Sequence, residues 1–113
     1  GKITHASAAN GTSLDNTAST ASGLAAVLEL VALATGTVTV VVQESSDNGG
    51  VDPFAAKATF TAVAAASAPT AERITATGTV ERYLRVATSG TFTNADFAVA
   101  VRRGTAQDRV AYA

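Results

Sequence analysis

The sequence predicts an all-β domain, an antiparallel β-sandwich of Ig-like or jelly-roll type with six to eight strands. Several segments alternate apolar and polar residues with the period of two that strands show, and turn residues separate them about every ten residues. No segment convincingly predicts a helix, and a length of 113 residues fits one domain. We assign residues 24–103 to the sandwich, residues 1–23 to a flexible N-terminal arm or linker, and residues 104–113 to a flexible C-terminal tail.

The first pair of strands is expected directly after the arm. Residues 23–36 read GLAAVLELVALATG and have a composition that suits a helix, but the next residues, TVTVVVQ at 37–43, alternate as a strand does. A lone apolar helix would leave that strand unpaired, so we expect a strand at 25–33 as well. Thr35 and Gly36 lie between the two segments and predict a short hairpin turn.

The remaining strands are expected in the second half of the chain. AKATFTAV at 56–63 alternates, a flexible loop follows at 64–70, and a short strand is expected at 72–76. The clearest alternation is TVERYLRVATSG at 79–90, and FAVAVRR at 97–103 repeats the pattern. These strands, joined by turns, specify an antiparallel arrangement.

Composition narrows the classes of function. Hydrophobic residues make up 47% of the chain, but many are alanine, which removes little apolar area from water, so we expect a thin core that neighbouring subunits help to stabilise. The net charge of −1 and the scattered arginines argue against nucleic acid as a partner. The longest apolar run, 23–34, is interrupted by Glu29 and is too short to span a bilayer, so we predict a soluble chain without membrane insertion.

The stretch SSDNGGVDPF at 45–54 is the first candidate for a site. Asp47 and Asp52 could form a catalytic acid pair, but they share one glycine-rich loop without a cleft beside them. Asp47, Asn48 and Asp52 are weak calcium candidates, because they offer oxygen ligands without the EF-hand spacing. The favoured interpretation is a hairpin loop in which Asp-Asn-Gly-Gly tolerates positive φ and Phe54 re-enters the core.

Other catalytic or metal chemistry lacks the residues it needs. The chain has no Cys and a single histidine, His5, so a zinc site lacks ligands and a Ser-His-Asp triad lacks a rigid setting. We therefore expect no enzymatic activity, no cofactor and no resident metal.

The sequence ERYLR at 81–85 is the second candidate. Together with two loop residues it supplies candidate contacts for a partner protein or a glycan: Asp47, Asn48, Arg82, Tyr83 and Arg85. A simpler interpretation is a cross-strand ion pair with Glu81 or Glu72, worth well under about 1 kcal/mol when exposed. The alternation places Arg82 on the apolar face of Leu84, an anomaly that an interface would explain.

Five motifs, taken in order, resemble the carboxy-terminal domain of major tail (tube) proteins of long-tailed bacteriophages. They are N-G-T-S-x-D-N at 10–16, V-x-V-Q-x-S-x-D at 40–47, F-T-A-V at 60–63, G-T-V-x-R-Y-x-R at 78–85 and F-A-V-A at 97–100. The resemblance covers most of the chain. It departs from the family after the Ser-x-Asp turn, where Asp-Pro-Phe replaces the usual tryptophan.

The resemblance implies a non-enzymatic structural virion protein on the outer surface of a tailed phage particle. Its expected partners are other copies of itself and the tube or major capsid protein, which the two terminal arms would reach. No tube-forming domain precedes Gly1 in this sequence, so we expect an excised domain or a free-standing decoration protein. A looser similarity of the S-x-D hairpin and the RYLRV strand to galactose-binding-like jelly rolls implies the alternative, an adhesion module that binds a host-surface glycan.

Overall fold

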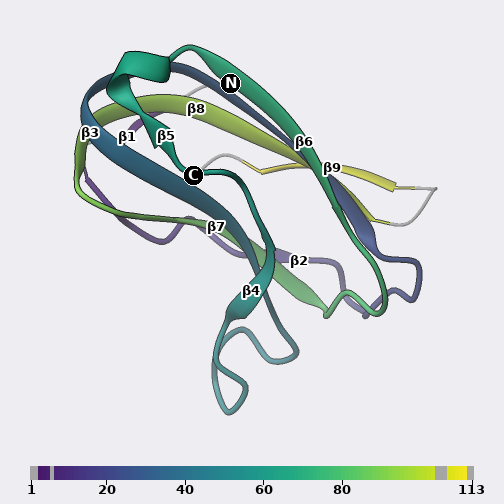
Figure 1. Ribbon diagram of the computed structural model, residues 1–113. Coiled ribbons are helices and arrows are strands. Elements are labelled where there is room, and N and C mark those ends of the chain that lie inside the picture. Colours follow the sequence, from purple (N-terminus) through teal and green to yellow (C-terminus); the bar gives the residue numbers. More distant parts are fainter. Residues whose placement is uncertain (1–2, 6, 104–106, 112–113) are drawn as a thin grey trace.

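The computed structural model describes the backbone of residues 3–5, 7–103 and 107–111 and the side chains of residues 7–103. Within these residues the chain forms nine antiparallel strands and one 3-10 turn (Figure 1). In chain order these are β1 (Ile3–His5), β2 (Leu14–Asp15), β3 (Leu24–Ser45), β4 (Ala55–Thr59), β5 (Val63–Ala64), η1 (Ala65–Ser67), β6 (Thr70–Ala76), β7 (Tyr83–Ser89), β8 (Phe92–Arg103) and β9 (Gln107–Ala111). The prediction of an all-β, antiparallel fold is confirmed.

The strands are hydrogen-bonded into one open sheet. Its main order is β1-β8-β3-β7-β2, with β4, β5 and β6 also paired to β3, and β9 paired to β8. The finer assignment to a sandwich of Ig-like or jelly-roll type stays a prediction. The described residues contain no helix long and apolar enough to cross a membrane.

Three strands, β3, β7 and β8, form the spine of the sheet. β3 pairs first with β8, beginning at Leu24 opposite Arg103, and then with β7, ending at Ser45 opposite Tyr83. β7 and β8 together therefore follow β3 along almost its whole length. Figure 1 shows β3 bending about halfway along, so that its second half runs back toward the side from which the strand begins.

The hairpin turn predicted at Thr35 and Gly36 is wrong, because β3 continues through both residues and the bend lies here instead. Gly36 has φ 88°, and a Cβ on it would overlap the carbonyl oxygen of Thr91. Gly90, in the connection between β7 and β8, has φ 99°, and its Cβ would lie 2.5 Å from the carbonyl oxygen of Thr37. Glycine is needed at both positions because the two backbones approach closely at the bend.

The bend divides the sheet into two halves that enclose one core. The first half contains β6, the start of β3, β8, β1 and β9, and the second contains β4, the end of β3, β7 and β2. The largest side chains that are fully buried include Phe60, Phe97, Leu28, Leu30 and Val40. Among the twenty buried hydrophobic residues described, only four are alanine, so the core is not the alanine core that composition suggested.

The N-terminal segment is part of the sheet. β1 pairs with β8, and β2 pairs with β7. Asn10 and Thr20 form single bridges with Ala87 and Val80, which extend this pairing along β7 and the residues before it. The prediction of a flexible arm is therefore wrong for residues 10–20, which complete an edge of the second half.

The predicted C-terminal tail is described only in part. Gln107–Ala111 form β9, which pairs with β8 and widens the first half. Residues 104–106 and 112–113 lie outside the described residues.

Arg103 connects the two halves at the open end of the fold, opposite the bend. Its side chain is 3% exposed, and its guanidinium donates to the backbone carbonyl oxygens of Glu81 at 2.7 Å and Arg82 at 3.0 Å. Longer hydrogen bonds reach the carbonyl of Val80 at 3.4 Å and the hydroxyl of Thr20 at 3.3 Å. One buried arginine thus holds the end of β8 against the segment that leads into β7.

Two half-buried side chains connect β4 with the segment after β6, and β6 with the segment after β4, along one side of the fold. The Lys57 ammonium donates to the carbonyl oxygens of Thr77 at 3.1 Å and Thr79 at 2.9 Å. The Glu72 carboxylate accepts the backbone N–H of Thr61 at 2.8 Å and its hydroxyl at 2.9 Å. The two strands are thus linked through side chains on this side.

Candidate functional site

The structure brings both predicted candidate segments together at one end of the second half. The loop at 46–54 joins β3 to β4, and the pairing of Glu44 with Ala55 confirms that it closes a hairpin. On the other side of β3, Ser45 lies opposite Tyr83 and Gln43 lies opposite Arg85. The loop and the start of β7 are therefore neighbours.

The loop is organised around a buried serine. Ser45 is fully buried, and its hydroxyl donates to the carbonyl oxygen of Asp52 at 2.6 Å and accepts the N–H of Gly49 at 2.8 Å. Asn48 and Gly49 have φ values of 61° and 81°, so the predicted positive-φ turn is confirmed. The hydroxyl of Ser45 therefore links the start and the end of the loop.

The carboxylate of Asp47 closes the same loop from the outside. It accepts the backbone N–H groups of Gly50 at 3.0 Å, Val51 at 2.7 Å and Asp52 at 3.1 Å. These hydrogen bonds, the one from Val51 first, hold the pKa of Asp47 below its usual range. Among the residues that the structure describes, no group of three or more acidic or histidine side chains is placed to hold a metal ion. The three N–H donors show that the carboxylate of Asp47 closes the loop.

Asp52 pairs with Glu81 rather than with Asp47. Its carboxylate accepts the N–H and the hydroxyl of Ser46, both at 2.9 Å, and a side-chain hydrogen bond links it to Glu81. The bonds from Ser46 lower the pKa of Asp52, whereas loss of hydration and then the neighbouring Asp52 raise the pKa of Glu81. Of the two carboxyl groups, Glu81 therefore binds a proton more readily than Asp52, and when it is protonated it is the hydrogen-bond donor of the pair.

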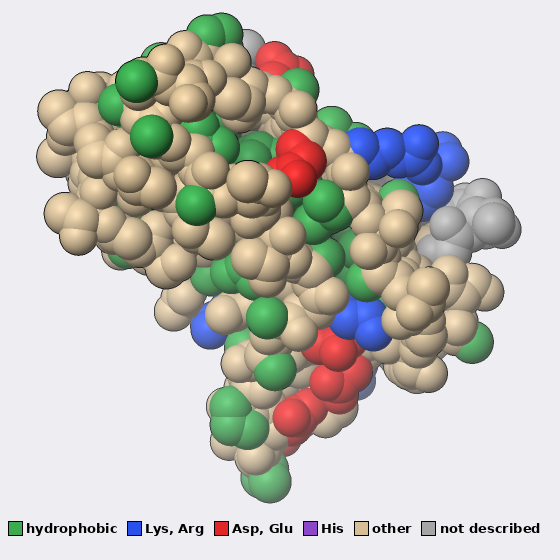
Figure 2. Space-filling view, in the orientation of Figure 1, with side chains coloured by type: hydrophobic (Ala, Val, Ile, Leu, Met, Phe, Trp, Pro, Cys, Tyr) green, Lys and Arg blue, Asp and Glu red, His purple; other side chains and the backbone are tan. Residues whose placement is uncertain are grey.

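Glu44 adds a further carboxylate to this end of the molecule. It accepts the backbone N–H of Glu81 at 3.0 Å, and its negative charge contributes to the raised pKa of Glu81. Figure 2 shows acidic side chains gathered on the lower part of the molecule in that view. The sequence pattern did not connect Glu81 with the loop, because the two lie in separate segments, and it did not single out Glu44, which directly precedes Ser45.

Arg82 pairs with Asp15 in the N-terminal segment. Its guanidinium forms two hydrogen bonds to the carboxylate, at 2.7 and 2.9 Å, and lies 4.9 Å from the ring centre of Tyr83. The contact lowers the pKa of Asp15 to about 2. Arg82 therefore forms an ion pair, but with Asp15 and not with the predicted Glu81 or Glu72. The anomaly of an arginine on an apolar face also disappears, since the chain bends at Arg82 before β7 begins.

Arg85 is engaged with the loop. Its guanidinium lies 4.2 Å from the ring centre of Phe54, and its Nε donates to the side-chain oxygen of Gln43 at 2.7 Å. Phe54 is only half-buried, so the prediction that it re-enters the core is wrong. Phe60, which is 1% exposed, is the aromatic residue that this region contributes to the core.

A shallow polar hollow lies beside the acidic residues. It has a volume of about 330 Å³ and is lined by Ala18, Ser19, Ser46, Thr79, Glu81 and Arg82. It brings together hydroxyls, a carboxyl and a guanidinium. Tyr83, the aromatic residue closest in sequence, is not part of its wall.

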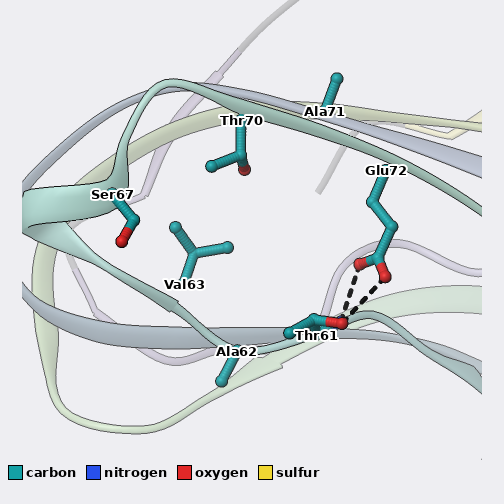
Figure 3. Close-up of a pocket in the computed structure, with 7 residues that line it drawn as sticks. All are labelled: Thr61, Ala62, Val63, Ser67, Thr70, Ala71 and Glu72. Atoms are coloured by element: carbon teal, nitrogen blue, oxygen red, sulfur yellow. Dashed lines mark hydrogen bonds between the residues drawn. The ribbon is translucent and has the colours of Figure 1, made fainter.

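A second hollow lies between β5, η1 and β6 (Figure 3). It has a volume of about 270 Å³ and is lined mainly by small side chains and hydroxyls, including Ala62, Val63, Ser67 and Thr70. Its one charged residue is Glu72, whose carboxylate is directed to Thr61. The side chain of His5, the single histidine, lies outside the described residues.

The candidate residues thus act mainly on one another. A scan against protein-family models finds no match to the chain, and a search of curated proteins finds none either. The polar groups of the two candidate segments close a loop, fix an N-terminal segment and stack an arginine on an aromatic ring. This arrangement holds three segments together at one end of the fold: the loop at 46–54, the N-terminal segment at 10–20 and the start of β7.

Proposed function

We propose that this chain is a non-enzymatic structural protein of a tailed bacteriophage, a β-domain on the outer surface of the particle. The observation that carries the proposal is the set of five motifs that resemble the tube-protein domain and occur in the same order along most of the chain. Tail tube and capsid are the two surfaces on which such a domain would be displayed, in contact with neighbouring subunits.

The arrangement of the motifs supports this proposal. Residues 10–16 run along β7, where the N–H of Gly11 donates to the carbonyl oxygen of Val86 at 2.6 Å and that of Asn16 to Arg82 at 3.0 Å. β7 in turn pairs with the end of β3, which carries the V-x-V-Q motif. Three motifs that are distant in the sequence are therefore neighbours in space, as parts of one inherited structural unit would be.

The use of the polar side chains supports a structural role as well. Asp47, Asp15 and Arg85 all serve contacts within the chain. A catalytic pair would need a cleft that places a substrate beside both groups, whereas only Glu81 of the Asp52–Glu81 pair lines the shallow surface hollow. Because the segment at 10–20 is hydrogen-bonded to the sheet, contact with neighbouring subunits is expected from exposed strand faces rather than from this segment.

Labelling of particles tests the proposal. An antibody raised against the purified chain and detected with gold is expected to mark phage particles, at repeated positions on the tail or over the capsid. The same antibody adsorbed with the purified chain is the control. Label confined to unassembled protein, with bare particles, would contradict a virion location.

A carbohydrate-binding adhesin is the second candidate, and the polar hollow beside Glu81 and Arg82 is the observation that favours it. Sugars are bound through hydroxyls and charged groups of this kind, usually with an aromatic ring against the sugar face. A glycan array probed with and without calcium tests it, and Ser19→Ala with Thr79→Ala should weaken any binding. An empty array under both conditions removes this candidate.

A further inference from the structure

The peptide bond between Asp52 and Pro53 lies near the end of the loop at 46–54, where Asp52 is half-buried and Pro53 is exposed. It is the one Asp-Pro bond of the sequence. Two properties make such a bond easier to break than other peptide bonds. The aspartate carboxylate can attack its own carbonyl carbon and close a five-membered ring. The proline nitrogen, which carries no N–H, is a tertiary amide nitrogen and accepts a proton more readily than other amide nitrogens.

The carbonyl group of this bond accepts a short hydrogen bond from a buried hydroxyl. Ser45 is fully buried, and its Oγ donates to the carbonyl oxygen of Asp52 at 2.6 Å. A donor fixed at a carbonyl oxygen stabilises the negative charge that develops there when the carbon is attacked, and it does so more strongly where water is excluded. Ser45 is therefore placed to assist attack on this carbonyl.

The two carboxyl groups beside the bond differ in their affinity for a proton. The N–H and the hydroxyl of Ser46 hydrogen-bond to the Asp52 carboxylate, both at 2.9 Å, and lower its pKa, so it remains ionised as a nucleophile must. Glu81, which is hydrogen-bonded to the Asp52 side chain, has a raised pKa and holds a proton as a general acid must. Environments that move two such pKa values apart assign one group as nucleophile and the other as acid.

We propose that the folded chain cleaves its own Asp52–Pro53 peptide bond in mildly acidic solution. A carboxylate oxygen of Asp52 bonds to the carbonyl carbon of the same residue while the hydroxyl of Ser45 donates to the carbonyl oxygen. The bond from this carbon to the nitrogen of Pro53 breaks, and the proton held by Glu81 passes to that nitrogen, directly or through water. One water molecule then hydrolyses the cyclic anhydride and leaves Asp52 with a free α-carboxyl group, so no other co-reactant is needed.

The reaction needs no cleft, because the substrate is part of the chain itself. β3 lies in the first piece, residues 1–52, whereas β4, β6, β7 and β8, with which it pairs, lie in the second, residues 53–113. The cleaved domain therefore stays folded as two pieces, and the loop opens near its end. Each chain reacts once, which is compatible with a structural role, and the inference does not rest on the proposed function.

Charged groups face Glu81 from each element around it. They are Glu44 at the end of β3, Asp47 and Asp52 in the loop, Lys57 on β4, the adjacent Arg82, and Arg103 at the end of β8. Loss of hydration, and then the three carboxylates, raise the pKa of Glu81, whereas Arg103 donates to its backbone carbonyl oxygen. Cleavage should therefore persist to a higher pH than the ordinary pKa of a carboxyl group would allow.

Mass spectrometry of the full chain under denaturing conditions tests the reaction. After incubation at about pH 5, the pieces 1–52 and 53–113 are expected, with masses that add up to the intact chain plus one water. A synthetic peptide of residues 45–54 and the chain in about 8 M urea keep the Asp-Pro bond without the fold, so both should be cleaved at least about a hundredfold more slowly. A folded chain that is cleaved no faster than the peptide overturns the proposal.

Single substitutions test the role of each group. Asp52→Asn removes the carboxylate nucleophile and Pro53→Ala removes the tertiary amide, so either should abolish cleavage. Ser45→Ala and Glu81→Gln should each slow it by at least about tenfold. Glu72→Gln changes a glutamate whose carboxylate bonds to Thr61 on the side of the fold, and this control should be cleaved at the wild-type rate.

The pH dependence separates the action of Glu81 from the intrinsic lability of an Asp-Pro bond. In the peptide, the rate should fall as pH rises through the ordinary pKa of aspartate. In the folded chain the fall should lie at higher pH, and Glu81→Gln should return it to that of the peptide. Melting temperatures identify variants that fail to fold, and Glu81→Gln, which keeps a donor for Asp52, serves if Ser45→Ala does not fold. Fast cleavage with the pH profile of the peptide, unchanged by Glu81→Gln, would contradict the mechanism.

Discussion

The two connections between the halves of the sheet differ in burial and in what they hold. At the open end, Arg103 is 3% exposed, and its guanidinium donates to three consecutive backbone carbonyls. On the side, Lys57 and Glu72 make four hydrogen bonds in all, but in contact with water. When a buried donor is removed, its acceptors are left without a hydrogen-bond partner, because water cannot reach them. Exposed acceptors that lose a donor form hydrogen bonds to water instead. The stability of the folded sheet should therefore depend on the open end far more than on the side.

The largest effect is expected from Arg103→Ala. The carbonyls of Val80, Glu81 and Arg82 lose a charged donor in a buried setting, so the free energy of unfolding should fall by about 3 to 4 kcal/mol. Urea unfolding followed by circular dichroism measures it, and Arg103→Lys, which keeps the charge but not the planar fork, should recover part of the loss. If Arg103→Ala lowered the free energy of unfolding less than Lys57→Ala does, the side connection and not the open end would be the more important of the two.

The bend opposite Arg103 should be the next most sensitive position. Gly36→Ala combines a positive φ with overlap against the carbonyl of Thr91, and we expect a loss of about 2 to 3 kcal/mol. Gly78→Ala is the matched control, because Gly78 has φ 84° and a Cβ added to it would meet nothing within 4 Å. The control should lose only about 1 kcal/mol, the part due to φ alone. Equal losses would mean that close approach at the bend is unimportant.

Removal of the side connection should have a small effect. For Lys57→Ala we expect the free energy of unfolding to fall by less than about 1 kcal/mol, since water replaces the ammonium at both carbonyls. The same unfolding experiment measures it. In the double variant Lys57→Ala with Arg103→Ala, the two losses in free energy of unfolding should add. A sum that differs strongly from the two single losses would indicate that the two connections are not independent.

The smallest effect is expected from pH at the acidic end. The folded pKa of Glu81 is raised, so the stability that it contributes is present below its unfolded pKa and is lost as pH rises through the folded value. Glu81→Gln keeps a donor for Asp52 and removes the charge, so it should melt slightly above wild type at about pH 7 and no higher at about pH 3. A melting difference that does not vary with pH would remove protonation of Glu81 as its cause.

Asp47 and Asp52 act with the opposite sign. Their folded pKa values are lowered, so their stabilising contributions are present above the unfolded pKa and disappear as pH falls through the folded values. Melting temperature against pH for Asp47→Asn should therefore show a smaller decline in acid than the wild-type curve. An unchanged decline would place the acid sensitivity in other carboxylates.

The candidate site was predicted in part. The hairpin loop at 46–54 was found from Asp-Asn-Gly-Gly, because positive φ is a local property that residue type reveals. Asp15, Glu81 and Arg103 were not connected with it, since each acts through a residue more than twenty positions away. Phe54 was placed in the core because it is aromatic, and only the position of Arg85 shows why it stays half-buried.

The sequence by itself determined the all-β, antiparallel class and the positive-φ turn of the loop at 46–54, because alternation and turn residues act over a few neighbours. Only the tertiary structure decided that Gly36 lies at a bend, that residues 10–20 belong to the sheet and that one arginine holds the open end. The physical reason is the same in each case. A glycine between two apolar runs permits a turn or a close approach equally well, and the partner strand across the sheet selects between them.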